Sequence, residues 1–294
     1  MIYTTKVFKR DILVPNVEPL QNFTLSKNII KCSSLVYVRP IHSGNLKVSL
    51  SNTMNLNHPS NSGLRDEEIM VPIFAYLLHH EKYGYFLIDS GCESSYADNP
   101  YGPMKGLLFP KVMPQTILRP NEAIEKQLPE PVLKQIQAVF FTHLHFDHTS
   151  GLPALPKNLI YVAGKGEKSY SIKWLLEPHH FKNGDVIYLI DFGSKSTQTF
   201  PIGRAVDLFG DQTLWAISTS GHSKGHISYL INSKDGPILI AGDACIRNKS
   251  LEIGVGPGTS SCDIAKAQRT LDKICAFVKS NPTVKVWCGH DFPK

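Results

Sequence analysis

The chain has 294 residues, of which 42% are hydrophobic and 19% are charged, and its formal net charge is +6. This composition is typical of a folded globular protein and excludes a low-complexity or collagen-like chain. No apolar run approaches the roughly 20 residues of a membrane-spanning helix, so no membrane association is expected.

Residues 1–34 mix prolines with short apolar patches, and we expect them to form an N-terminal extension packed on or beside a single domain spanning residues 1–294. Residues 1–60 contain seven basic and two acidic side chains. We interpret this excess as a solvated basic face. Neither a run of five basic residues nor aromatic–basic interleaving is present, so no nucleic-acid partner is expected.

The six cysteines are scattered and contain no Cys-x-x-Cys pair. They therefore predict neither a disulfide framework nor a zinc ribbon. The first ten residues lack the apolar segment of a secretion signal. Together these features predict a cytoplasmic protein with reduced thiols.

Short strands are expected at residues 35–38 and 46–50. Pro40 should stop the first strand, because proline cannot donate to a strand ladder, and a turn is expected around residues 43–45. Residues 51–68 are rich in Asn, Ser, His and Pro, which is typical of a long loop. Long loops in compact domains are often functional, so this one is a candidate pocket wall.

A hairpin follows, with strands at Val71–Leu78 and Tyr85–Ile88. His79 and His80 are expected in its exposed turn. Residues 92–119 contain several prolines and glycines and predict another irregular segment beside the substrate cleft. Two short helical pieces are expected within Asn121–Gln135, with Asn121 as the N-cap.

The second half of the chain alternates apolar runs with turn signals. An amphipathic helix is predicted from Asp263 to Ser280, and a further helix from Glu167 to Leu176. Residues 254–260 are interpreted as a pocket loop, because they lack the ending of a phosphate-binding motif. Further strands are expected at 158–162, within 181–190, and at 205–209, 214–218, 226–231, 237–241 and 284–288.

The most informative stretch follows the apolar run Ile136–Phe141 and reads Thr-His-Leu-His-Phe-Asp-His. In an extended chain His143 and His145 point to the same side, because side chains alternate with period two. Asp147 and His148 follow where the strand should turn, so they can face a second position beside the first. Imidazole and carboxylate groups suit zinc and similar transition metals. A lone histidine would be interpreted as a core residue, but this spacing predicts a metal site.

Other strands also lead into metal-competent residues. Asp243 and His290 each follow a glycine directly after an expected strand, the strand at 214–218 leads to Gly221-His222, and Asp89 ends the hairpin strand. Glycine allows the backbone to turn sharply at such positions. If these strand ends meet at one edge, the side chains converge on one site.

These motifs resemble those of the metallo-β-lactamase superfamily over about residues 70–294. The resemblance implies an αββα sandwich of two mixed β-sheets with external helices, and a dinuclear metal site at one edge. It implies that Asp243 bridges two metals and that Asp89 braces the ligand loop, whereas we interpret His226 as structural. By position, the remaining ligands are His143, His145 and His222 for the first metal and Asp147, His148 and His290 for the second.

The resemblance also implies two divalent cofactor ions, with zinc as the first choice and iron, manganese or cobalt as alternatives. A hydroxide shared between the metals would attack a carbonyl or phosphoryl centre. Asp147 is the candidate catalytic residue, which would orient the nucleophile or carry its proton to the leaving group. His179 and His180 have no place in the pattern and are expected in a loop or at the pocket rim.

Within the superfamily, Asp207–Asp211, the Gly-His-Ser-Lys-Gly-His run and Gly289-His290-Asp291 resemble the quorum-quenching N-acyl homoserine lactonase branch. That branch carries a tyrosine three residues after the bridging aspartate, where this chain has Ile246. Asp243, rather than a cysteine, at the bridging position disfavours a true β-lactamase. We expect a hydrolase of a small-molecule lactone or related ester, acting as a monomer or homodimer. The alternatives are a thioester hydrolase of the glyoxalase II type, a phosphodiesterase, and a metal-binding scaffold without catalysis.

Overall fold

The computed structural model describes residues 8–11, 36–61, 63–104, 113–167, 180–181 and 185–294. Most of the expected N-terminal extension and of the helix expected after Glu167 lie outside the described residues. No described helix has the length and apolar character needed to cross a membrane.

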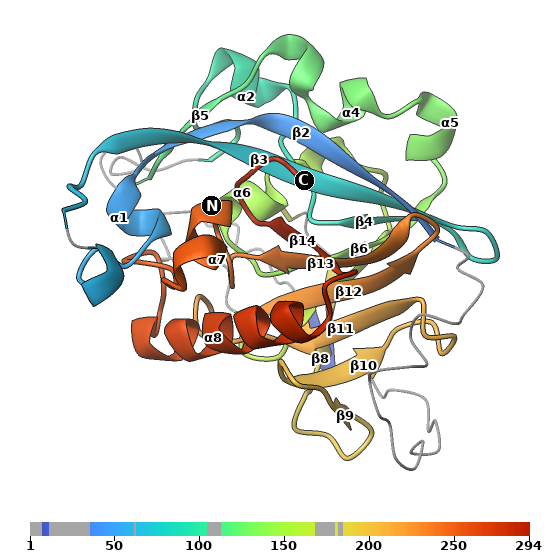
Figure 1. Ribbon diagram of the computed structural model, residues 1–294. Coiled ribbons are helices and arrows are strands. Elements are labelled where there is room, and N and C mark those ends of the chain that lie inside the picture. Colours follow the sequence, from blue (N-terminus) through green and yellow to red (C-terminus); the bar gives the residue numbers. More distant parts are fainter. Residues whose placement is uncertain (1–7, 12–35, 62, 105–112, 168–179, 182–184) are drawn as a thin grey trace.

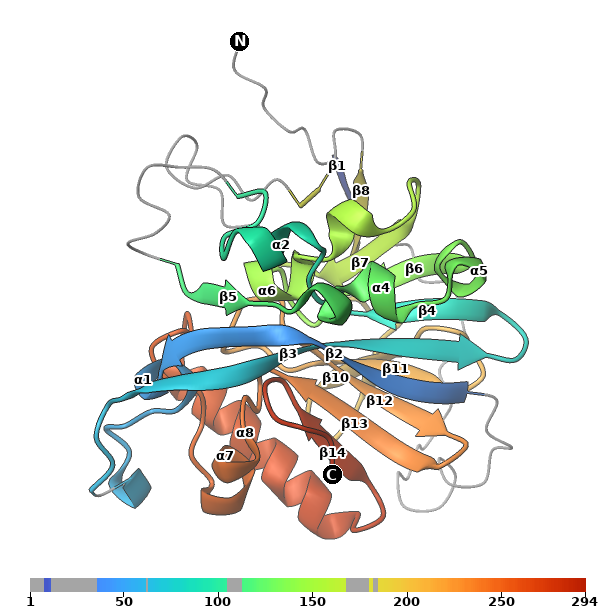
Figure 2. The same ribbon diagram turned by 90° about the horizontal axis from the view of Figure 1, so that it is seen from above.

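The described strands pair into one network of fourteen strands that packs as two layers (Figures 1 and 2). Both layers contain parallel and antiparallel pairs, and strand pairing links them at one position, Val36–Ser233. The first layer contains β1 (Phe8–Asp11), β8 (Val186–Ile190), β7 (Ile160–Gly164), β6 (Ile136–Phe140), β4 (Gly84–Ile88), β3 (Glu68–His80), β2 (Val36–Ser49) and β5 (Gln115–Ile117). The second contains β14 (Lys285–Cys288), β13 (Gly236–Gly242), β12 (Ile227–Ser233), β11 (Leu214–Ser218), β10 (Arg204–Asp207) and β9 (Gln198–Thr199).

The main core lies between the two layers. Phe86 and Phe140 of the first layer face Tyr229 of the second, and the rings of Tyr76 and Trp287 stack with centroids 5.7 Å apart. Because side chains alternate along a strand, the opposite face of each layer carries its own apolar set, and helices cover these outer faces. This confirms the expected αββα sandwich.

Helix α8 (Ile264–Ser280) covers the outer face of the second layer (Figure 1). Its Ile274 and Phe277 pack on that face, and the Asp263 carboxylate caps the helix by accepting from the Lys266 amide at 2.8 Å. Both features agree with the amphipathic pattern. The other described helices are α1 (Leu50–Thr53), α2 (Ser95–Asp98), α4 (Ile124–Gln127), α5 (Glu130–Leu133), α6 (Phe146–Thr149), α7 (Asn248–Ile253), and the short 3-10 turns η2 (Pro59–Asn61), η3 (Pro120–Glu122) and η4 (Leu152–Ala154).

Three local predictions were wrong. Pro40 does not end a strand, because β2 pairs with β3 on both sides of it. The other edge of β2 has no described strand partner over residues 37–44, and proline is tolerated at such an open edge. His80 is fully buried, and its Nε2 donates to Asp211 Oδ2 at 2.9 Å. Asn121 lies within η3, and α4 begins at Ile124.

Candidate metal centre

Seven histidines and aspartates meet at one edge of the sandwich. His143 and His145 lie in the loop after β6, and Asp147 and His148 lie in α6. The second layer supplies His222 after β11, Asp243 after β13 and His290 after β14. Their metal-competent atoms form two groups, and within each group all these atoms lie within 4.8 Å of one another.

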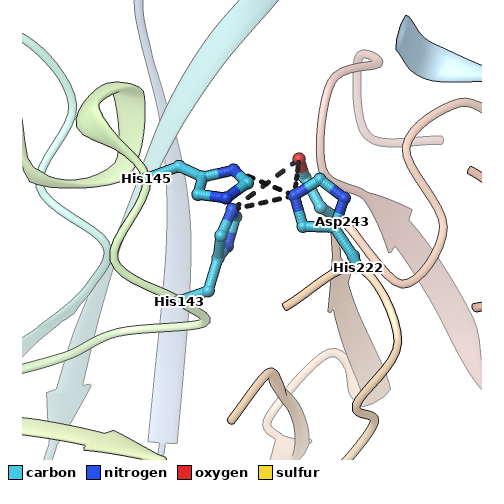
Figure 3. A group of neighbouring side chains, drawn as sticks. All are labelled: His143, His145, His222 and Asp243. Carbon is cyan, nitrogen blue, oxygen red and sulfur yellow. Dashed lines mark hydrogen bonds and ion pairs between the residues drawn. The ribbon is translucent and has the colours of Figure 1, made fainter. Parts of the chain in front are cut away.

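The first group contains His143, His145, His222 and Asp243 (Figure 3). His222 Nε2 lies 3.2 Å from His143 Nε2 and 3.0 Å from His145 Nδ1. Asp243 Oδ2 lies 3.3 Å from His222 Nε2 and 3.9 Å from His143 Nε2. Four potential ligand atoms therefore surround one point.

The second group contains Asp147, His148 and His290. Asp147 Oδ2 lies 3.3 Å from the Nε2 atoms of both histidines. Asp243 Oδ1 lies 3.3 Å from His290 Nε2 and 3.6 Å from His148 Nε2. Asp243 thus offers one carboxylate oxygen to each group.

These groups fit divalent cations. Ligand atoms about 2.0–2.1 Å from a tetrahedral zinc lie roughly 3.3 Å from one another, close to most of the separations measured here. His148 Nε2 and Asp243 Oδ1 are buried without a hydrogen-bond partner among the described residues, and they lie 3.6 Å apart, where a cation would satisfy both.

Neighbouring groups orient the histidines of the second set. Asp89, at φ 55°, accepts from the Thr142 amide, the Thr142 hydroxyl and His148 Nδ1, each at 2.8 Å. His290 Nδ1 donates to the Pro72 carbonyl at 2.8 Å. With a proton on Nδ1, each ring presents its Nε2 lone pair to a metal.

Burial and neighbouring charges separate the histidine pKa values. Burial lowers the pKa of His145 to about 4, and burial with the nearby histidines lowers that of His143. Burial also opposes the charged form of His290, but the Asp243 charge and hydrogen bonds to Asp147 raise its pKa to about 10. Burial also opposes the charged form of His148, but the nearby Asp147 and Asp89 raise its pKa. The metal-free second group therefore holds protons where a cation would sit.

The sequence also matches a known protein family. The family model described as the metallo-beta-lactamase superfamily matches residues 70–276. The chain belongs to the metallo-β-lactamase superfamily. This agrees with the resemblance seen in its motifs.

Relatives within the superfamily include N-acyl homoserine lactonases. The enzyme AttM of Azorhizobium caulinodans is 29% identical over 262 residues, covering 85% of this chain and 91% of AttM. AttM of Agrobacterium fabrum is 28% identical over the same length. A solved N-acyl homoserine lactone hydrolase, with N-hexanoyl-L-homoserine at its catalytic metal centre, has a TM-score of 0.67 at 19% identity and covers 88% of this chain and 94% of its own. AidC, a dizinc quorum-quenching lactonase, has a TM-score of 0.55 at 13% identity and covers 89% of both chains. These two structures support the superfamily fold.

The other described histidines of this superfamily member lie outside both groups. His226 Nδ1 bonds the Thr219 hydroxyl at 2.8 Å, and its ring lies 5.2 Å from that of His143, so it packs beside the first group. His180 was expected in a loop or at the pocket rim; it lies in a turn but is buried, with the Tyr96 and Thr149 hydroxyls each at 2.7 Å. His179 lies outside the described residues.

The sequence interpretation missed the functional context of Glu167, which it assigned to the start of a helix. Glu167 is buried in the turn after β7 and bonds both loops that carry the first group. Glu167 follows Gly166, as Asp243 follows Gly242, but Lys165 and Gly166 separate it from the end of β7, so it lacks the strand–glycine–acid pattern that selected Asp243.

A cavity of about 300 Å³ opens over both groups. As expected, residues 51–68, 92–119 and 254–260 contribute to its lining, through Asn52, Met113 and Ser260 among others. Ile246 also lines it and is buried. The rest of the lining is largely apolar and includes Leu46, Val48, Val71 and Phe146.

Proposed function

We propose that this protein is a metal-dependent hydrolase of lactones or related carboxylic esters, similar to the N-acyl homoserine lactonases. The main support for this proposal is the pair of ligand groups that share Asp243 and line a largely apolar cavity. The AttM relatives, which match along most of this chain, favour a lactone over the thioester and phosphodiester alternatives.

We further propose two zinc ions as the resident cofactor. His143, His145 and His222 would hold the first ion, Asp147, His148 and His290 the second, and Asp243 would bridge them. When bound, such a pair supplies an acidified water and polarisation of a carbonyl oxygen.

In this proposal Asp147 handles the proton. Burial would raise its pKa, but the neighbouring His148 and His290 hold the pKa well below the usual range, so the group is an ionised acceptor lining the cavity. The water oxygen bonds to the carbonyl carbon, and the bond between that carbon and the ring oxygen breaks. The proton that Asp147 accepts from water passes to the ring oxygen, which gives a hydroxy acid.

The apolar wall supports a substrate with an aliphatic group beside the ester. Leu46, Val71 and Met113 offer only carbon and sulfur surfaces from their side chains, which suits an acyl chain. Ile246 adds to this wall and brings no side-chain hydrogen-bond donor. Orientation of the substrate would therefore fall to the metal-competent residues and to polar side chains such as Asn52.

We also propose one domain over residues 1–294, with 1–34 as its extension, acting in the cytoplasm as a monomer or homodimer. Pairing of β1 with β8 supports an extension packed on the first layer. The six scattered cysteines, without a Cys-x-x-Cys pair, support a reducing compartment.

The test is proton release from N-acyl homoserine lactones by metal-loaded protein near neutral pH, where each ring opening releases one proton. We expect turnover by the wild type and by Asp235→Asn, an exposed control, and a loss of about 10²–10⁴-fold in Asp147→Asn. Equal rates in Asp147→Asn would contradict the role of Asp147. No release by protein that holds two metals would contradict the lactonase proposal.

A further inference from the structure

The two loops that carry the first ligand group are joined by one buried carboxylate. Glu167 follows β7, and only 3% of its surface is exposed. Its Oε2 accepts from the amide of Leu144, at 3.1 Å, and Leu144 stands between His143 and His145. Glu167 therefore holds the backbone from which both histidines project.

The other carboxylate oxygen holds the His222 loop. Glu167 Oε1 accepts from the amide of Gly225 at 2.8 Å and from the hydroxyl of Ser223, the residue after His222. The His143 loop belongs to the first layer and the His222 loop to the second. A single side chain thus fixes the separation of ligand loops from opposite layers.

The backbone around Glu167 is built for this contact. A Cβ on Gly164 would overlap the Gly225 carbonyl, and a Cβ on Gly225 would lie 2.5 Å from the Gly164 carbonyl oxygen. Only glycine at both positions lets the end of β7 approach the His222 loop so closely. This approach brings the Glu167 carboxylate within reach of the donors on that loop.

The second ligand group has different supports. Asp89 accepts from His148, and the Pro72 carbonyl accepts from His290. The hydrogen bonds of Glu167 to Leu144, Ser223 and Gly225 hold the loops of the first group, and these three residues are not part of the second group. A change at Glu167 should therefore act on one metal position and spare the other.

We propose that Glu167 is a positioning residue that sets the affinity of the first metal position by clamping the His143–His145 and His222 loops together. The inference rests on the proposed metal roles. A carboxylate is required because it is an acceptor at both oxygens and meets three donors. Glutamine would turn an NH₂ group towards at least one N–H or O–H donor.

The test compares metal binding by wild type, Glu167→Gln and the exposed control Glu252→Gln, each titrated with Co²⁺ and with Zn²⁺ against a chromophoric chelator. We expect Glu167→Gln to lose about 10–100-fold in affinity at one of two positions, with the other unchanged. The Co²⁺ absorption of the histidine-rich position should weaken at equal metal loading. Turnover is a secondary readout.

Four outcomes would overturn the inference or its premise. Two positions of wild-type affinity in Glu167→Gln would refute it, and equal loss at both would replace it with a general structural role. If Glu167→Gln does not fold by circular dichroism, Ser223→Ala removes one donor and should weaken the same position by a smaller factor; an unchanged affinity there would also refute the clamp. Wild-type protein that takes up fewer than two ions would refute the proposed metal pair itself.

Discussion

Asp89→Asn tests how the second metal position is prepared. The Asp89 carboxylate gives one oxygen to the Thr142 amide and the other to the Thr142 hydroxyl and His148 Nδ1. In the variant, the amide oxygen can keep the backbone bond, and the NH₂ group then faces His148. The ring can accept this donor only by moving its proton to Nε2, the atom that points at Asp147 and Asp243.

The loss of metal affinity expected in Asp89→Asn follows from the reversed direction of the hydrogen bond between residue 89 and His148. A hydrogen bond to a charged group contributes about 1.5–3 kcal/mol. Groups that orient metal-binding histidines typically contribute about 10–100-fold in affinity, or roughly 1.4–2.7 kcal/mol. The two ranges agree, so we expect Asp89→Asn to weaken the second position by about 10–100-fold. The first position should weaken by a smaller factor, because Asp89 reaches His143 only through the Thr142 hydroxyl, which lies 3.1 Å from His143 Nδ1.

The assay is competition with a chromophoric chelator for Zn²⁺ at pH 7.5, with total bound metal measured after gel filtration. Thermal unfolding of the metal-free variant separates lost affinity from lost folding. An unchanged affinity at both positions in a folded variant would refute the argument that Asp89 sets the proton position of His148.

Two further predictions use the same measurements. Gly289→Ala should reduce bound metal at both positions and cost about 1–3 kcal/mol of folding stability, because its Cβ would overlap Asp243 Oδ1. The backbone φ of Gly289 lies outside the left-handed region, so the effect would come from this overlap and not from backbone strain. The control is Gly193→Ala, whose Cβ would meet only the Asp191 side chain at 3.1 Å, and full metal content in Gly289→Ala would contradict the clash. Metal binding near pH 7.5 should release up to two protons, since the pKa of His290 is raised to about 10 and that of His148 is also raised, so apparent affinity should increase with pH up to about 10. Calorimetry in buffers of different ionisation enthalpy measures these protons, and heats independent of the buffer would argue against protonated histidines.

The parts of the site that could be predicted from the sequence depend on local signals. An apolar run followed by a glycine and a ligand marks the ends of β13 and β14, and the period-two spacing of His143 and His145 follows from strand geometry. These signals occupy a few consecutive residues. To predict that these ligand residues converge, we needed only the assumption that the strand ends share one edge.

The parts that could not be predicted depend on residues far apart in the chain. Glu167 meets donors 23 and 58 residues away, and His80 is buried beside an aspartate 131 residues away. Whether Pro40 interrupts a strand depends on which edge of β2 is paired. None of these facts is present in the local pattern.

The division of the ligands between the layers affects how the protein would be assembled in the cell. Each metal position takes side chains from both layers, and described strand pairing joins the layers only at Val36–Ser233. Bound cations would therefore act as cross-links against shear between the layers. Neither position is complete until the ribosome has added the second-layer residues, so a nascent chain cannot capture its ions early. Metal loading would then follow synthesis of the second layer.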